Sequence, residues 1–129
     1  MELIKKGTIK TLVNPGFESQ QLLFPENSAS ERVTITRVRL EPGAKNDRHQ
    51  HAASEQIWVA LSGQGKLLLA ESRTLPFEAG DVVRFAEGDV HGLLNTSAEM
   101  FDYLSVTAPP INFRSAYQRE KNLAAPPKP

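Results

Sequence analysis

Turn-forming residues divide the chain into short segments that have the composition of β-strands. Residues 32–40 are rich in β-branched side chains and alternate in part between apolar and polar positions. The run 57–61 is apolar on both faces and too short, between its turn signals, for a buried helix. Short strands at this close and regular spacing predict an all-β sandwich or barrel. Comparable segments are expected at 8–13, 20–24, 66–70, 74–77, 82–85, 90–94 and 100–107.

The end of the chain has a different composition from the rest. We expect one barrel domain over residues 1–112, ending just after the pair Pro109-Pro110. Residues 113–123 predict a short helix, because the run 119–121 would give it a charged face. Residues 124–129 contain three prolines and are expected to form a flexible tail.

The overall composition excludes several classes of protein. Lysine plus arginine and aspartate plus glutamate both number 15, so the formal charge is zero, which argues against a nucleic-acid or anionic-membrane partner. The chain has no cysteine, which rules out disulfides, thiolate ligands and cysteine nucleophiles. The amino terminus lacks an apolar signal region, and no stretch approaches transmembrane length. We therefore expect a cytoplasmic protein.

All three histidines of the chain fall inside two glycine-bounded motifs. A β-strand directs alternate side chains to one face, so His49 and His51 project together if residues 46–51 are extended. Two adjacent imidazoles suit a borderline divalent ion, and His91 is the remaining histidine that can complete the set. For an isolated pair, a solvated strand end is the alternative. The motifs are Gly43-x5-His49-x-His51-x4-Gln56-x6-Gly63 and Gly80-x5-Ala86-x-Gly88-x2-His91-x3-Asn95.

These two blocks resemble the paired motifs of the cupin superfamily, G-x5-H-x-H-x3,4-E-x6-G and G-x5-P-x-G-x2-H-x3-N, over residues 43–95. The resemblance implies a double-stranded β-helix, or jelly-roll barrel, with a metal inside. It also implies that His49, His51 and His91 bind one divalent transition metal per chain, either Fe, Mn, Ni or Zn. Small single-domain cupins are often dimers, so we expect a homodimer.

Two positions depart from the family pattern. Ala86 stands where the second motif has proline, which we expect to loosen a bend without touching the metal. In the first motif Gln56 keeps the six-residue spacing to Gly63, whereas Glu55 does not. A slip of one residue turns a side chain to the other face of its strand, so we favour Gln56 as the fourth ligand and keep Glu55 as the alternative.

The choice of fourth ligand separates two reaction classes. Three imidazoles and an amide leave the charge of a divalent ion uncompensated, which favours Lewis-acid chemistry on a small polar or anionic molecule. We therefore expect an enzyme of the isomerase, epimerase or lyase type. An Fe(II)-dependent dioxygenase of a small organic substrate is the first alternative. A non-catalytic metal-dependent module that binds or senses a small molecule is the second.

Further site residues follow from strand alternation. Tyr103 is a candidate catalytic acid, base or hydrogen-bond donor, and Trp58 and Phe101 are candidate pocket walls. Arg37 and Arg39 share one face of their strand and would bind a carboxylate if that face were inward. We favour an outward, solvated face, because charged side chains seldom point into a small barrel.

Overall fold

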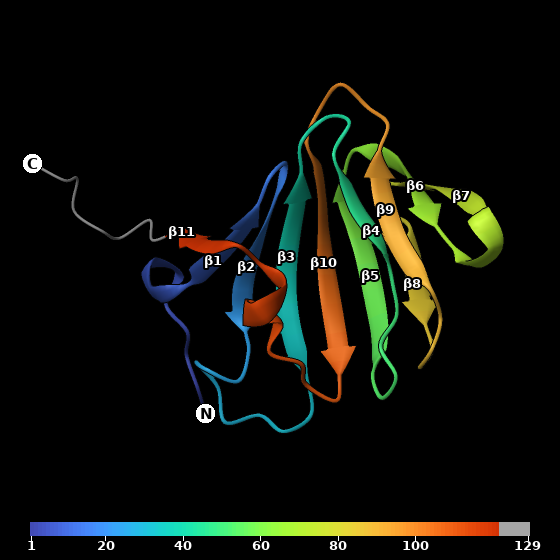
Figure 1. The fold of residues 1–129 in the computed structure, drawn as a ribbon. Coiled ribbons are helices and arrows are strands. Elements are labelled where there is room, and N and C mark those ends of the chain that lie inside the picture. Colours follow the sequence, from blue (N-terminus) through green and yellow to red (C-terminus); the bar gives the residue numbers. More distant parts are fainter. Residues whose placement is uncertain (122–129) are drawn as a thin grey trace, which may run out of the picture.

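The computed structural model describes residues 1–121, which form two antiparallel β-sheets that face each other (Figure 1). The seven-stranded sheet has the order β11-β1-β2-β3-β10-β5-β8, and the four-stranded sheet has the order β4-β9-β6-β7. The strands are β1 (Lys10–Asn14), β2 (Phe17–Leu23), β3 (Thr34–Leu40), β4 (Lys45–His49), β5 (Glu55–Ser62), β6 (Gln64–Leu68), β7 (Thr74–Glu78), β8 (Val82–Phe85), β9 (His91–Asn95), β10 (Phe101–Ala108) and β11 (Arg119–Lys121).

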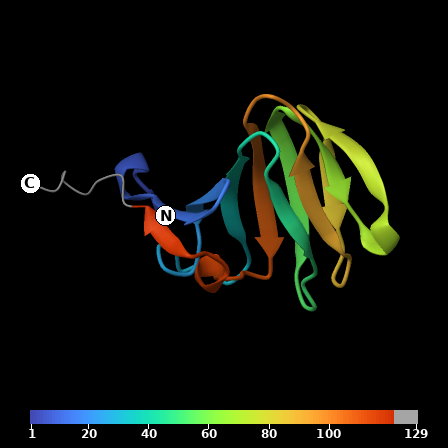
Figure 2. The same cartoon turned by 45° about the horizontal axis from the view of Figure 1, so that its top comes forward.

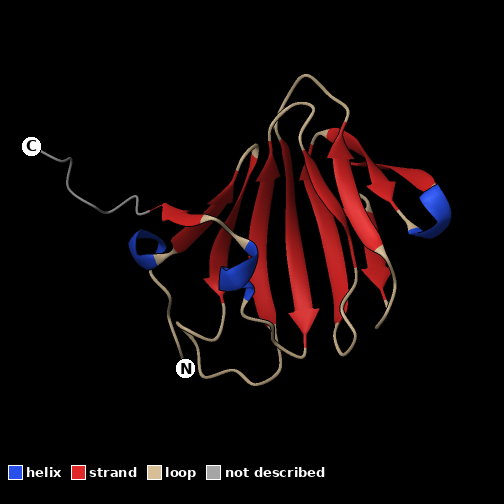
Figure 3. Ribbon diagram, viewed as in Figure 1, coloured by secondary structure: helices blue, strands red, loops and turns tan. Residues whose placement is uncertain are grey.

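Helical structure in residues 1–121 is limited to short 3₁₀ turns (Figure 3). These turns are η1 (Lys6–Thr8), η2 (Ala70–Ser72) and η3 (Phe113–Ala116). No helix among the described residues is long and apolar enough to cross a membrane.

The prediction of a helix over residues 113–123 is wrong for the part that the structure describes, residues 113–121. Only the η3 turn forms, and β11 then pairs antiparallel with β1, with Arg119 opposite Val13. The edge of β1 offers backbone hydrogen bonds to a passing segment, and this tertiary pairing outweighs a weak helical preference. The expected tail over residues 124–129 lies outside the described residues.

The two sheets lie face to face (Figure 2), and the buried hydrophobic cluster takes side chains from both of them. Strand β3 shows the governing alternation, because its even-numbered residues are buried and its odd-numbered ones are partly exposed. On the outward face Arg37 and Arg39 both approach the carboxylate of Asp102 on β10. The outward orientation that we favoured for the two arginines is therefore correct. The buried cluster comprises Val38, Leu40, Trp58, Ala60, Leu67, Phe77, Phe85, Leu93, Phe101 and Tyr103.

The segment that joins β10 to β11 comprises residues 109–118; we call it the strap. Asn14 at the end of β1 makes two hydrogen bonds to the strap. Its Nδ2 donates to the Ala116 carbonyl at 2.9 Å, and its Oδ1 accepts from the Gln118 amide at 2.8 Å. Arg114 of the strap also donates to both carboxylate oxygens of Glu26, at 2.7 and 2.6 Å. The strap is thus attached to the amino-terminal part of the sheet.

Candidate metal centre

The three histidines converge at the inner face of the four-stranded sheet. The ring centroid of His49 lies 5.1 Å from that of His51 and 4.3 Å from that of His91, and the centroids of His51 and His91 are 5.2 Å apart. One nitrogen of each ring can be chosen so that all three lie within 4.8 Å of one another. Three imidazole nitrogens at this separation are able to share one cation.

Hydrogen bonds select the nitrogen that each ring presents. The Nδ1 atom of His49 lies 2.7 Å from the carbonyl of Asp47, and the Nδ1 atom of His91 lies 2.8 Å from the carbonyl of Asp89. A carbonyl only accepts, so each Nδ1 carries the proton and each Nε2 keeps its lone pair. Both histidines therefore use the carbonyl two residues earlier to fix the tautomer that binds a metal.

The Nε2 atoms of His51 and His91 are buried and have no hydrogen-bond partner among the described residues. A buried polar atom without a partner is costly, and such atoms in a folded protein call for a missing ligand. Two unpartnered lone pairs beside a third imidazole fit a divalent cation better than they fit a solvated strand end. The three histidines therefore fit a divalent metal.

The pKa values agree with neutral, coordinating imidazoles. Burial lowers the pKa of His91 to about 4, and the hydrogen bond to Asp89 offsets part of that effect. Burial also lowers the pKa of His51, and the neighbouring His49 lowers it further. Since imidazole has to be deprotonated to bind a metal, these rings are in the competent state at neutral pH.

A bulge in β4 sets the position of His49. The pairing of β4 with β9 slips between Asn46 and His49, so that one extra residue of β4 fits between two pairs of the ladder. Gly92 of β9 faces this bulge, and a Cβ at that position would lie 2.6 Å from the Asn46 carbonyl oxygen. Glycine is thus required where the two backbones approach, immediately after His91.

The turn of the second motif supports two of the histidines. The amide of Gly88 donates to the carbonyl of His51 at 2.8 Å, and the carbonyl of Asp89 accepts from the ring of His91. The Ala86 amide donates to the Asp89 side chain at 2.8 Å. A proline at Ala86 would have no amide proton, so the departure from the family motif adds a bond to this turn.

The two candidate fourth ligands lie on opposite faces of β5. Gln56 is buried, and its Oε1 accepts from Trp58 Nε1 at 3.1 Å while its Nε2 donates to Thr107 Oγ1 at 2.9 Å. Glu55 is turned outward and accepts two bonds from Arg84, at 2.9 and 2.6 Å. The Gln56 oxygen retains a second lone pair, whereas the Glu55 carboxylate is already paired on the outer surface.

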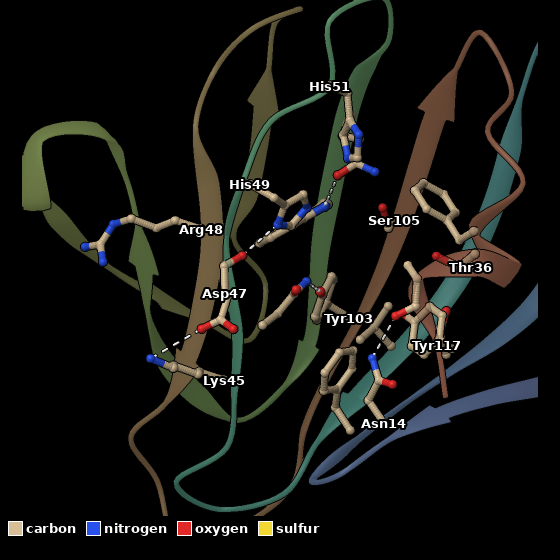
Figure 4. Close-up of a pocket in the computed structure, with 18 of the residues that line it drawn as sticks. Asn14, Thr36, Lys45, Asp47, Arg48, His49, His51, Tyr103, Ser105 and Tyr117 are labelled. Carbon is tan, nitrogen blue, oxygen red and sulfur yellow. Dashed lines mark hydrogen bonds and ion pairs between the residues drawn. The ribbon is translucent and has the colours of Figure 1, made fainter. Parts of the chain in front are cut away.

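A cavity of about 440 Å³ extends from the histidines across the barrel (Figure 4). His49 and His51 line it on the side of β4, and Thr36 and Ser105 line it on the side of the larger sheet. Its other lining residues are Asn14, Phe17, Ser19, Val38, Lys45, Asn46, Asp47, Arg48, Gln50, Gln56, Trp58, Tyr103, Phe113, Ala116 and Tyr117.

The remaining sequence-predicted residues fall into two groups. Trp58 and Tyr103 both line the cavity, and burial raises the pKa of the Tyr103 hydroxyl well above its ordinary value. Phe101 does not line it. Phe101 is fully buried in the core, where its ring stacks on Phe77 with centroids 5.8 Å apart, because it lies one inward position beyond Tyr103 along β10.

Sequence reasoning missed the contribution of the chain ends to the cavity. Phe113 of the strap places its ring 5.8 Å from that of His51, and Tyr117 meets Phe17 of β2 at 5.5 Å. No local sequence pattern predicts these contacts, because they depend on the pairing of β11 with β1.

Comparison with known proteins identifies the family. The chain is 28% identical over 89 residues to an oxalate-binding protein from Thermotoga maritima, covering 69% of this chain and 73% of the relative. A predicted oxalate decarboxylase from Thermotoga maritima has a similar structure, with a TM-score of 0.71 and 23% identity over 83% of this chain and 98% of the other.

A conserved protein with a double-stranded β-helix domain from Klebsiella pneumoniae gives a TM-score of 0.69 at 23% identity, over 76% of this chain and 81% of the other. Likeness at this identity shows the fold, and it confirms the predicted double-stranded β-helix. The cupin domain family matches residues 36–107, which is more than half of the chain. The protein therefore belongs to the cupin family.

Proposed function

We propose that the chain binds one divalent transition metal through His49, His51, His91 and the Oε1 atom of Gln56. The observation that carries this proposal is the pair of buried, unpartnered Nε2 atoms of His51 and His91 beside a third imidazole. Gln56 is favoured over Glu55 because its oxygen lies on the inner face of β5 and lines the cavity.

We further propose that the site acts on a small anionic molecule by isomerisation, epimerisation or elimination. A divalent cation held by four neutral ligands supplies an uncompensated positive charge and Lewis-acid polarisation. Trp58 and Thr107 hold the Gln56 amide in one orientation through their hydrogen bonds. The Phe113 ring packs edge-on against that of His51, with centroids 5.8 Å apart, and adds an apolar wall beside the histidines.

Tyr103 is the candidate hydrogen-bond donor of this site. Its hydroxyl is buried, lies 3.4 Å from the Asn46 amide nitrogen and faces the cavity. Because burial raises its pKa, the hydroxyl stays protonated; its oxygen accepts from Asn46 and its proton is kept to donate a hydrogen bond to a ligand. The relative named as an oxalate-binding protein supports a ligand that carries a carboxylate.

A non-catalytic binding module is the second candidate, and the composition of the cavity favours it. Asp47 is the one carboxylate among the lining residues of the described chain, and it is exposed and paired with Lys45 at 3.3 Å. A site for proton abstraction ordinarily has a base within hydrogen-bond reach of the substrate. A site for capture of an anion does not need one.

Metal analysis followed by ligand titration tests these proposals. The purified protein should contain close to one divalent metal per chain, and calorimetry should show that oxalate binds to the loaded protein and not to protein stripped with a chelator. A metal-free protein that also fails to take up Zn, Mn, Ni or Fe would refute the metal site. Oxygen uptake by the iron-loaded protein with candidate acids would favour a dioxygenase instead.

A further inference from the structure

The inner face of the larger sheet carries two neighbouring hydroxyl groups that the histidine site does not use. Ser105 on β10 pairs in register with Thr36 on β3 and, on its other side, with Trp58 on β5. Thr36 and Ser105 are only 3% and 4% exposed, and both line the cavity. Figure 4 shows the two side chains on the wall across from His49 and His51.

Neither hydroxyl has a hydrogen-bond partner, whereas the threonines beside them do. Thr34, the next inward residue of β3, bonds to the backbone of Ile111 at 3.1 Å as both donor and acceptor. Thr107, the next inward residue of β10, accepts from Gln56. Among residues 1–121, no hydrogen bond reaches the side chain of Thr36 or Ser105. The two hydroxyl oxygens are not among the fully buried atoms without partners and belong to residues that line the cavity, so the cavity is where they can bond a ligand.

The walls between the hydroxyl pair and the histidines are aromatic. Trp58 and Tyr103 lie with ring centroids 4.7 Å apart, and Phe17 and Tyr117 close the side toward the strap. A cavity of about 440 Å³ is far larger than oxalate, one of the smallest dicarboxylates. The aromatic side chains favour a flat apolar group in the ligand. The hydroxyls of Thr36 and Ser105 on the far wall favour a ligand with an oxygen in addition to those of its acidic group.

We propose that Thr36 and Ser105 form a second subsite of the cavity, which binds the hydroxyl or carbonyl oxygen of a ring-containing organic acid. The acidic group of that ligand lies at the histidine cluster, and its ring lies between Trp58, Phe17 and Tyr117. This inference rests on the proposed metal site and names its substrate class. Serine and threonine both donate and accept, so the pair takes either kind of oxygen.

The test is a binding titration of the zinc-loaded protein with three probes, which are para-hydroxybenzoate, benzoate and oxalate. Trp58 is the only tryptophan of the chain and lines the cavity, so its fluorescence reports occupancy directly. Wild-type protein should bind para-hydroxybenzoate about tenfold more tightly than benzoate, the size of one or two added hydrogen bonds. Oxalate should bind more weakly than either ring compound.

The double variant Thr36→Val with Ser105→Ala should bind both aromatic acids alike, with benzoate affinity unchanged. Thr36→Ser alone should keep most of the preference, because serine retains the hydroxyl. Thr11→Val is the matched control, since Thr11 is equally buried in β1 and does not line the cavity. It should keep the full preference for para-hydroxybenzoate.

Three different results would overturn the subsite, the ligand class and the metal site, respectively. Equal binding of the two aromatic acids to wild type, or an unchanged preference in the double variant, would overturn the subsite alone. Zinc-dependent binding of oxalate without either ring compound would overturn the ligand class and leave the metal site standing. A lack of zinc binding would overturn the proposed function together with this inference.

Discussion

His49 lies directly opposite His91 in the antiparallel pairing of β4 with β9, and their ring centroids are 4.3 Å apart. Direct cross-strand neighbours are the closest side-chain pairs in a sheet. The pair exists only because the β4 bulge shifts the register by one residue before His49. The metal centre therefore depends on a backbone irregularity as much as on the identity of its ligands.

The bulge makes Gly92 a residue that controls metal affinity without touching the metal. In Gly92→Ala the new Cβ would meet Asn46 O at 2.6 Å and Arg48 N at 3.0 Å, and both are backbone atoms that cannot rotate away. We expect a loss of about 1–3 kcal/mol in the free energy of unfolding and a roughly 10- to 100-fold weaker metal affinity. Calorimetric zinc titration and denaturant unfolding measure the two effects.

Gly7→Ala is the control for this prediction, because nothing lies within 4 Å of a Cβ built at Gly7. It should leave metal affinity and stability nearly unchanged. Wild-type zinc affinity in Gly92→Ala would show that the register of β4 and β9 does not govern the site.

Removal of a histidine ligand should abolish tight metal binding. In His91→Ala or His49→Ala the remaining donors hold the cation weakly, so the stabilisation that metal gives to wild type is lost. That stabilisation is about 4 kcal/mol when free metal is a thousandfold above its dissociation constant. Metal content and the shift of melting temperature on zinc addition are the readouts. Gln50→Ala, a change at an exposed residue between two ligands, should retain the metal content and the shift of melting temperature. Unchanged metal content in the two histidine variants would refute the assignment of the histidines as ligands.

The strands and the histidine cluster were predictable because each has a local signature. Alternation and turn residues marked most of the strands, and the spacing of the two motifs predicted the convergence of His49, His51 and His91. The part that failed depends on long-range pairing. Residues 113–123 could not be assigned correctly without knowing that β1 offers a free edge, and the roles of Phe113 and Tyr117 in the cavity follow from that pairing.

Metal-free protein should lose stability in acid over a defined range. The pKa of His91 is about 4 in the folded protein against 6.5 in an unfolded chain, because burial disfavours the charged ring. The unfolded state thus binds the proton more tightly, so the free energy of unfolding is independent of this group above pH 6.5 and falls as pH drops from 6.5 to 4. The lowered pKa of His51 acts in the same direction.

Denaturant titrations of chelator-treated protein between these limits measure this slope. His91→Gln, which cannot take up a proton, should show a shallower slope than wild type. The Glu26 carboxylate, whose pKa is lowered from 4.5 to about 2 by Arg114 and Asn112, adds a slope of the same sign below about pH 5 in both proteins, so the difference between the two slopes isolates His91. A slope that is identical in wild type and His91→Gln would contradict the prediction.

Two separate variants, one that adds a negative charge at residue 56 and one that removes the charge at residue 55, test which residue is the fourth ligand. In Gln56→Glu the carboxylate can still accept from Trp58, and the Thr107 hydroxyl can turn to donate to it. The added negative charge should strengthen zinc binding and weaken oxalate binding by about tenfold or more. Glu55→Gln is the matched control; it alters only the outward pair with Arg84 and should leave both affinities unchanged. A change of zinc affinity in Glu55→Gln alone would reassign the ligand.

The strap should loosen when Asn14 is removed. In Asn14→Ala the carbonyl of Ala116 and the amide of Gln118 both lose their side-chain partner, which costs about 1–3 kcal/mol locally. We expect faster hydrogen exchange at Gln118 and stronger quenching of Trp58 fluorescence by acrylamide, because the strap lines the same cavity as Trp58. Dissociation of an aromatic acid from the zinc-loaded variant should also be faster.

Gln64→Ala, which removes an exposed amide on the four-stranded sheet, should change neither the hydrogen exchange, the quenching nor the dissociation rate. Wild-type exchange and quenching in Asn14→Ala would mean that the pairing of β11 with β1 holds the strap without this side chain.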